Sequence, residues 1–309
     1  MRVSLFKLTF PHGLHISPHE LSLDDSSFAI PADTLFSALL SAWVRRGMEA
    51  MAWLDPFLGG KPPFLITSAF PYSEKGLSFP KPFHLRLFGE WRHAEFLPET
   101  AFYRLCKGDS QGLEEGTPEE FWKIEQIPRV SLDRFTNRSN LFFVGRVHFR
   151  PGCGLWFGVA WLQPEERCQD LPFREAFMLA LRELAATGLG GDRCVGYGQF
   201  EFELLDEVDW PDPAPGGCGV LLSRLWPKEE EIPALRDSLA WRFVEVGGWA
   251  ETPAGHVRRK RVRLVKEGSV VPAGVQGGLA DLTPPGFAAH RIWRYGYAFL
   301  YPLEVGHGA

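Results

Sequence analysis

Glycines cluster around one arginine in a short segment of the chain. Five of them lie within residues 188–198, at Gly188, Gly190, Gly191, Gly196 and Gly198, with Arg193 between them. A glycine-rich backbone can bring several N–H groups close to an anion, and an arginine adds positive charge. A tight turn needs only one or two glycines, so we expect a loop that faces a ligand. A plain turn remains the alternative. The segment lacks the dinucleotide-binding and P-loop spacings.

A second segment, residues 129–140, alternates arginine, amide and hydroxyl side chains with apolar ones. Its candidate binding residues are Arg134, Thr136, Asn137 and Arg138. Such side chains can contact the phosphates and 2′-hydroxyl groups of RNA. A solvated polar loop, with Asp133 paired to Arg134, explains the same composition equally well.

Two segments near the C-terminus combine positive charge with apolar side chains. Residues 258–263 are mostly basic, and they either follow a nucleic-acid backbone or keep a strand edge solvated. In residues 290–299, strand alternation places Arg291 and Tyr295 on one face, with Arg294 between them. Arginine and aromatic rings can stack on unpaired bases, although packing in the core is the commoner role of each aromatic ring.

Three histidines, His12, His15 and His19, are the only candidates for acid–base chemistry near the N-terminus. An RNA-cleaving site needs such groups. No carboxylate or lysine partner accompanies them in a fitting pattern, so we expect loop histidines without a catalytic role. No motif indicates a metal site or a cofactor, and no hydrolase or kinase signature is found.

Composition restricts the class of protein. The chain has 309 residues, 45% of them hydrophobic, and a net charge of −5. This is ordinary for a globular protein, and a mild negative charge does not exclude nucleic acid, because local patches matter more. The sequence shows neither a membrane-spanning stretch nor a signal peptide. Five irregularly spaced cysteines argue against a disulfide framework and favour a reducing, cytoplasmic location.

Hydrophobic periodicity predicts the elements that position these motifs. A strand is expected over Arg2–Phe10, with Val3 and Leu5 on one face and Phe6 and Leu8 on the other. A helix follows at 33–46, with Asp33 as its candidate cap. Further strands are expected at 64–70, 140–150, 155–162 and 199–206, and a second helix at 172–187. The Pro-Gly-Cys-Gly turn at 151–154 predicts that 140–150 pairs with 155–162.

The order strand, helix, strand, strand, helix, strand is the ferredoxin-like pattern. We therefore expect an α+β fold in which residues 1–209 form a ferredoxin-like (RRM-like) domain. A long insertion interrupts this domain at about 71–139, and we expect irregular structure over 71–128. The Pro- and Gly-rich stretch at 210–217 predicts a linker. Residues 217–309 are then expected to form a second, degenerate ferredoxin-like domain.

Together these segments resemble the RAMP superfamily of CRISPR proteins. The resemblance rests on residues 31–39 (PADTLFSAL), on the Asp-Arg-x-Thr sequence at 133–136 and on the glycine-rich loop. The closing residues 290–299 look like one branch, subunit four of the type III-A (Csm) effector complex. Ala32 and Asn137 depart from the pattern, since serine and glycine are common there.

The resemblance implies a non-catalytic subunit that needs no cofactor. Such a subunit binds the 5′ handle of the CRISPR RNA (crRNA), the large polymerase-like subunit and the first Csm backbone subunit. The glycine-rich loop would face the handle, and residues 133–138 would lie at the base of a thumb that separates handle from guide. No motif places the thumb itself, for which residues 81–104 are the candidate.

Two alternatives remain open at this point. A RAMP-type endoribonuclease would share the fold and the glycine-rich loop, and would use His15 or His19 as acid or base to cut repeat RNA. The equivalent subunit of a type III-B complex would keep the binding role in a related assembly.

Overall fold

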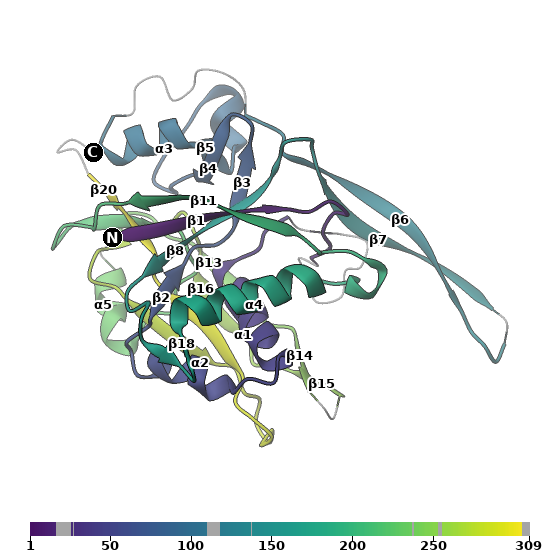
Figure 1. Cartoon of the computed structure of the whole chain (residues 1–309). Helices are drawn as coiled ribbons and strands as arrows, with labels where there is room; N and C mark the ends of the chain where they lie inside the picture. The colour runs from purple at the N-terminus through teal and green to yellow at the C-terminus, as the bar shows by residue number, and fades with distance from the viewer. Residues whose placement is uncertain are drawn as a thin grey trace.

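The fold is built around one seven-stranded antiparallel sheet (Figure 1). The computed structural model describes residues 1–16, 26, 28–109, 118–136, 138–236, 238–252 and 255–304. The main path of the sheet runs β11–β1–β8–β3–β4–β5, and β2 also pairs with β8. Its strands are β1 (Arg2–Thr9), β2 (Phe64–Ile66), β3 (Phe70–Ser73), β4 (Gly76–Pro80), β5 (Phe96–Pro98), β8 (Gly154–Trp161) and β11 (Glu201–Asp209).

The expected order of elements is present in the first two thirds of the chain. Along the sequence, β1, α1 (Ala32–Arg45), β2, β8, α4 (Phe173–Thr187) and β11 follow one another. Their strands are neighbours in the order β11–β1–β8–β2. A helix α2 (Ala50–Leu58), a 3₁₀ turn and the short pair β9 (Arg167–Cys168) and β10 (Leu171–Pro172) are added to this set. No helix in the described ranges is long and apolar enough to cross a membrane.

The expected alternation of β1 is confirmed, and it divides the interior into two hydrophobic cores. Phe6 and Leu8 pack with α1 and α4 on one face of the sheet. Val3 and Leu5 pack on the other face, against helix α3 (Glu99–Cys106) and the C-terminal strands. Both faces of the sheet are therefore covered.

Residues 71–128 are more regular than we expected. They include β4, β5, α3 and the start of β6 (Trp122–Leu132), which pairs with β7 (Ser139–Phe149) over its whole length. The expected pairing of 140–150 with 155–162 is wrong, because β8 lies between β1 and β3 instead. The turn at 151–154 therefore reverses the chain without joining two paired strands.

The C-terminal part contains small sheets and little helix. A three-stranded sheet runs β17–β12–β20, and three two-stranded sheets accompany it. Their strands are β12 (Cys218–Leu221), β13 (Phe243–Val246), β14 (Trp249–Thr252), β15 (Gly255–Arg258), β16 (Val262–Val265), β17 (Val270–Pro272), β18 (Gly277–Asp281), β19 (Trp293–Tyr297) and β20 (Leu300–Leu303). Its only described α-helix is α5 (Ile232–Leu235).

The two parts share their cores across the expected linker. Tyr295 and Tyr297 belong to the core that contains α1, and Val220 and Tyr301 belong to the core beneath α3. Trp210, at the start of the expected linker, is itself buried. The C-terminal part adds two small clusters of its own. The division at 210–217 thus separates stretches of sequence but not independent cores.

Candidate nucleic-acid interface

A long hairpin projects from the body of the protein (Figure 1). It consists of β6 and β7, whose register runs from Trp122 opposite Phe149 to Leu132 opposite Ser139. Because side chains alternate along strands, one face is mostly apolar and the other mostly polar. The apolar face carries Trp122, Ile124, Pro128, Val130, Leu132, Leu141, Phe143, Val147 and Phe149. The polar face carries Lys123, Glu125, Arg129, Ser131, Asn140, Arg146 and His148.

The polar face of the hairpin meets the glycine-rich loop at Tyr197. The guanidinium of Arg146 lies 4.5 Å from the centre of the Tyr197 ring, and that of Arg129 lies 5.8 Å from it. Arg129 also donates from Nη2 to the Tyr197 hydroxyl at 3.4 Å and lies 3.7 Å from a carboxylate oxygen of Asp192. The Nε groups of both arginines are buried without a hydrogen-bond partner in the described ranges. Neither arginine is thus fully satisfied within the protein.

Several glycines of the loop are required by the chain's own packing. The N–H of Gly191 donates to the carbonyl of His15 at 2.8 Å, and the N–H of Gly198 donates to the carbonyl of Gly13 at 3.0 Å. A Cβ at Gly190 would lie 2.3 Å from the His15 oxygen, and one at Gly198 would lie 1.9 Å from the Leu189 oxygen. Gly188 and Gly196 also donate, to the carbonyls of Leu184 and Arg193. Four of the five glycine N–H groups are therefore unavailable to an anion, and the turn interpretation accounts for these positions.

The part of the loop that remains open to a ligand is residues 190–196. Gly190 and Gly191 are exposed, and Arg193 is half-buried in a 3₁₀ turn, Arg193–Val195. No ion pair or side-chain hydrogen bond joins Arg193 to another described residue. Gly196 has a φ of +92° and open space around it. Arg193 thus remains the charged group of the loop that is available for binding.

The second motif lies at the tip of the hairpin, between the ends of β6 and β7. Asp133 accepts hydrogen bonds from the Phe135 amide at 2.9 Å and from the Thr136 hydroxyl at 2.5 Å. These bonds close the turn, so the hydroxyl of Thr136 is already occupied. Arg134 and Arg138 are exposed, and Phe135 is 99% exposed. Asn137 lies outside the described residues.

The hairpin keeps the two predicted motifs apart. Tyr197 contacts the hairpin at Arg129, six residues before Phe135 at the tip. At about 3.4 Å per residue, the strand places the tip about 20 Å from this contact. The loop and the tip can therefore contact one extended strand, but they do not surround a single small ligand.

The turn at the hairpin tip makes a pH-dependent prediction. The Thr136 hydroxyl, followed by the Phe135 amide, lowers the pKa of Asp133 below its ordinary value. We expect Thr136→Val to move that pKa back toward the ordinary value, as measured by an NMR titration of the side-chain carboxyl. Because the folded pKa is lowered, the turn is stabilised above the unfolded pKa and loses this stabilisation as the pH falls through the folded pKa. Asp281 is the internal control, since its pKa is lowered by its own neighbour Thr283. An unchanged Asp133 pKa would contradict the assignment.

Two of the predicted RNA-binding residues are buried, which corrects the expectation for residues 290–299. Tyr295 has no exposed surface; its ring stacks on Phe36 at 4.9 Å and its hydroxyl accepts from the Ile66 amide. Arg294 is 6% exposed and donates to Asp33 at 2.5 Å. Only Arg291 is exposed, 3.1 Å from Asp281. Pairing with β18 and packing beneath α1 bury both faces of this strand, so it offers no stacking surface.

The basic segment 258–263 is partly neutralised on its own surface. Glu245, on β13, lies 3.2 Å from Arg261 and 3.8 Å from Arg263. Arg259 donates to the carbonyl of Gly247 at 2.6 Å. These contacts favour the interpretation of a solvated strand edge over that of a dedicated phosphate track.

His15 is a packing residue. His15 is 5% exposed, and its Nδ1 lies 2.6 Å from the Gly145 carbonyl on the hairpin. Its ring also packs against Gly191, where a Cβ would lie 2.8 Å from Cδ2. His15 thus links the hairpin to the glycine-rich loop and is not open to substrate. His19 lies outside the described residues.

Sequence reasoning missed Arg146 and Tyr197, which join the hairpin to the loop. Strand periodicity did indicate that Arg146 lies on a strand, but not that β6 is its partner. The missing signal was the turn chemistry of residues 133–136, where an Asx-type turn marks a reversal. With that turn recognised, the register of β7 on β6 follows by counting.

Several known proteins are similar to this chain in sequence and in fold. The family model described as the CRISPR Csm4 C-terminal domain matches residues 216–303. The Csm4 protein of Thermococcus onnurineus is 30% identical over 298 residues, which cover 90% of this chain and 92% of that protein.

Two solved structures have the same fold over nearly the whole chain. One is a chain of the Csm3–Csm4 subcomplex in a type III-A CRISPR–Cas interference complex. It matches with a TM-score of 0.65 and 14% sequence identity, over 99% of this chain and 100% of that chain. The other is a Csm1–Csm4 cassette in complex with pppApA, with a TM-score of 0.62, 23% identity and full coverage of both chains.

Proposed function

The chain belongs to the Csm4 family of type III-A CRISPR complexes, and from this premise we propose that it is a non-catalytic subunit that binds the 5′ handle of the crRNA. The family is that of type III-A, which decides against the type III-B alternative. The ferredoxin-like description of both halves is part of this proposal. For residues 1–209 it is supported by the neighbouring order β11–β1–β8–β2.

The observation that carries the RNA-binding proposal is the contact between the hairpin and the loop. Arg129 and Arg146 are held over Tyr197 on the polar face, and Arg193 directly follows Asp192, the ion-pair partner of Arg129, in the loop. Guanidinium groups suit phosphates, and single-stranded RNA is bound through phosphates and unstacked bases together. The exposed Arg134 and Phe135 extend this basic and aromatic character to the tip.

A non-catalytic role is supported by the state of His15. A general acid or base must come within hydrogen-bond reach of the reacting group. His15 is buried, and its Nδ1 is engaged by the hairpin backbone. An endoribonuclease that uses this histidine would first have to separate the hairpin from the loop.

The proposed protein partners are the large subunit Csm1 and the backbone subunit Csm3. The two similar solved structures are complexes of Csm4 proteins with these subunits. The apolar face of the hairpin offers this chain a surface for such contact: Val130, Leu132 and Leu141 are each at least 59% exposed. Apolar side chains gathered on one exposed face are typical of interaction sites.

A paired binding and cleavage assay tests the proposal. Labelled RNA across a repeat–spacer junction, with and without the 5′ handle, is incubated with the protein alone and with co-expressed Csm1 and Csm3, without metal and with magnesium. Handle-dependent binding of intact RNA is the expected result. Site-specific cleavage that disappears in His15→Ala or His19→Ala would establish the endoribonuclease instead.

Loss of a single available arginine should weaken handle binding. We expect Arg193→Ala and Arg134→Ala each to cost about 1–3 kcal/mol of binding free energy, because a charge-assisted contact to phosphate is lost. Titration of fluorescent handle RNA measures this effect. Lys61→Ala is the matched control, since Lys61 is exposed and lies outside the hairpin and the loop. If either arginine variant matched this control, that arginine would be removed from the proposed site.

A further inference from the structure

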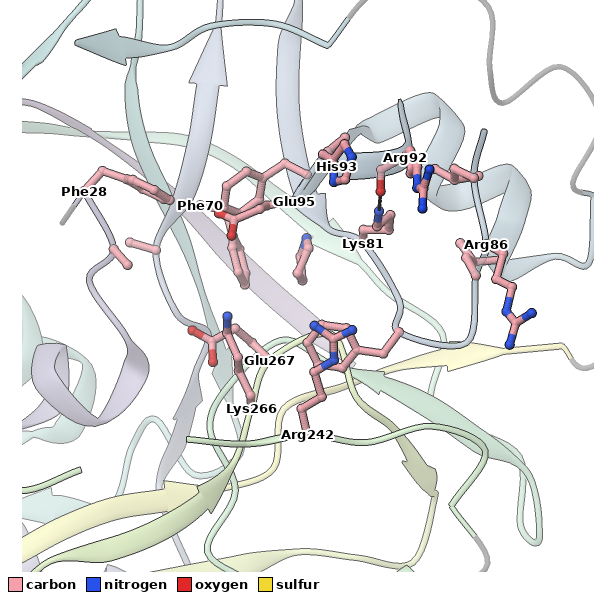
Figure 2. A pocket seen from close by; sticks show the side chains of 18 of the residues that line it. Phe28, Phe70, Lys81, Arg86, Arg92, His93, Glu95, Arg242, Lys266 and Glu267 are labelled. Carbon is pink, nitrogen blue, oxygen red and sulfur yellow. Dashed lines mark hydrogen bonds between the residues drawn. The ribbon is translucent and has the colours of Figure 1, made fainter. Parts of the chain in front are cut away.

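A cavity of about 970 Å³ lies apart from the glycine-rich loop (Figure 2). One wall is made by residues 80–96, which follow β4, and the other by the segments around Arg242 and Lys266 in the C-terminal part. Residues 81–96 of the segment 81–104, our candidate for the thumb, include much of this lining, and the rest of that segment belongs to β5 and α3. The two parts of the chain meet here, and only the folded protein brings these walls together.

Positive charge converges on the cavity from both walls. Five cations line it: Lys81, Arg86, Arg92, Arg242 and Lys266. Figure 2 shows Lys81 on one side, with Arg242 and Lys266 on the other. None of the five has an ion-pair partner within 4.0 Å among the residues that the structure describes. Of the two lining carboxylates, Glu267 is engaged by Arg224 at 3.3 Å, which leaves Glu95.

The charge of the cavity is only partly relieved among the residues that the structure describes. Burial lowers the pKa of Lys81, the positive charge of Arg242 lowers it further, and the negative charge of Glu95 offsets part of this lowering. The guanidinium of Arg242 lies 4.5 Å from the centre of the Phe83 ring, and the Lys81 ammonium donates to the Arg92 carbonyl at 3.0 Å. An anion between these walls would remove the repulsion and favour the charged form of Lys81.

The floor and rim of the cavity are aromatic. Phe28, Phe70, Phe83, Phe88 and Phe96 all line it. Phe88 is 68% exposed, and Phe83 and Phe96 are half-buried. Aromatic faces beside uncompensated cations are suited to a base and its phosphates, because bases stack on rings while phosphates contact the cations. An acidic peptide would use the cations alone and leave the rings without a role.

The cavity adjoins the base of the hairpin on its apolar face. The ring of Phe28 stacks on Trp122, the first residue of β6, with 3.7 Å between ring centres, and Phe96 meets Trp122 edge to face. Arg146 and Arg129, which contact the glycine-rich loop, lie on the opposite face of the same hairpin. The cavity and the loop therefore lie on different sides of the hairpin base.

We propose that this cavity is a second nucleotide-binding site, which takes a single-stranded nucleotide with its base against the phenylalanine rings and its phosphate between Lys81, Arg242 and Lys266. The observations that support this proposal all concern the cavity. The proposal therefore does not depend on the assignment of the glycine-rich loop to handle binding. The nucleotide is either part of an RNA strand or a free nucleotide, and the test separates the two sources.

The test uses the full-length protein, alone and in its complex with Csm1 and Csm3. Fluorescent single-stranded RNA across the handle–guide junction, ATP and a peptide of alternating glutamate and glycine are titrated against the wild type and the double variant Arg242→Ala/Lys266→Ala. We expect the double variant to lose on the order of tenfold in RNA affinity. The slope of log affinity against log salt concentration should become shallower by about 0.7, since the cavity holds one phosphate and each phosphate contact on a single strand contributes about 0.7. Arg242→Lys/Lys266→Arg should restore the salt slope, and Lys61→Ala should change nothing.

Phe88→Leu separates stacking from charge, since it keeps the apolar filling and removes a ring of the cavity other than Phe83, on which Arg242 lies. It should weaken RNA binding without changing the salt slope. Binding of ATP that is lost in the double variant, with RNA binding unchanged, would identify a free nucleotide as the ligand. If the double variant lost only peptide binding, or bound all three probes like the wild type, the nucleotide proposal would be overturned. Because Arg193→Ala is titrated in parallel, failure of the cavity and failure of the handle site give different results.

Discussion

Asp33→Asn is expected to destabilise the folded protein by about 3–5 kcal/mol, because it removes the buried carboxylate that pairs with Arg294 and also lies beside Arg224. Asp33 has no exposed surface. One of its oxygens lies 2.5 Å from Nε of Arg294, and the other lies 3.5 Å from Nη1 of Arg224. Arg294 also donates to the Thr34 hydroxyl at 3.1 Å. The amide of asparagine retains the size of the side chain but leaves the charge of Arg294 uncompensated.

Urea denaturation measures this effect as a lower midpoint of unfolding. Glu120→Gln is the matched control, since it also replaces a carboxylate by an amide in an ion pair with arginine. Glu120 and Arg150 are 77% and 52% exposed, so the control should cost no more than about 1 kcal/mol. Equal stability of Asp33→Asn and this control would show that the buried cluster does not hold α1 to β19.

Gly190→Ala is expected to cost about 2–5 kcal/mol of folding free energy, from two effects that add. The φ of Gly190 is +92°, a conformation that side chains disfavour, and a Cβ there would lie 2.3 Å from the His15 oxygen. Gly196 has the same φ with no atom within 4 Å of its Cβ position. Gly196→Ala should therefore cost only the conformational part, about 1–2 kcal/mol. The contact with His15 adds about 1–3 kcal/mol.

The comparison of these two variants separates the roles of the loop. Unfolding midpoints measure the cost to the fold, and handle titrations at a temperature where both variants are folded measure binding. We expect Gly190→Ala to be the less stable variant, because its side chain pushes the loop away from the segment that holds His15. Equal destabilisation at the two positions would mean that the loop moves freely and that its glycines serve conformation alone. On sequence alone, replacement of Gly190 would affect RNA binding more than folding; its contact with His15 makes folding the larger effect.

The sequence alone predicted much of the local structure and the family. Alternation placed Val3 and Leu5 on one face of β1 and Phe6 and Leu8 on the other, as observed. Helical spacing located α1 and α4 to within a few residues. These predictions hold because the period of burial is set by strand and helix geometry, which is local. The family resemblance rested on short motifs of the same local kind, and the comparison with known Csm4 proteins confirms it.

What the sequence left open was which surfaces meet. The residues 290–299 alternate like an exposed strand, yet Arg294 reaches across 261 positions to Asp33, which we had assigned as a helix cap. The helix α1 instead begins after Pro31 without a side-chain cap. Periodicity indicates that one face of an element is buried, but it does not identify the segment that packs on that face. A buried ion pair between distant segments therefore cannot be inferred from it.

The hairpin also shows that local elements can be predicted while their partners cannot. The sequence predicted the strand at 140–150 but not β6, which begins within a stretch expected to be irregular. The pairing of β7 with β6 instead of β8 was decided by the sheet, in which β8 is already flanked by β1 and β3. That choice placed Arg134 at a tip and Arg146 over Tyr197. The sequence by itself thus determined the motifs, the family and the elements outside residues 71–132 that position them. Only the tertiary structure decided which charges stay available for RNA, because burial and pairing depend on contacts between residues far apart in the chain.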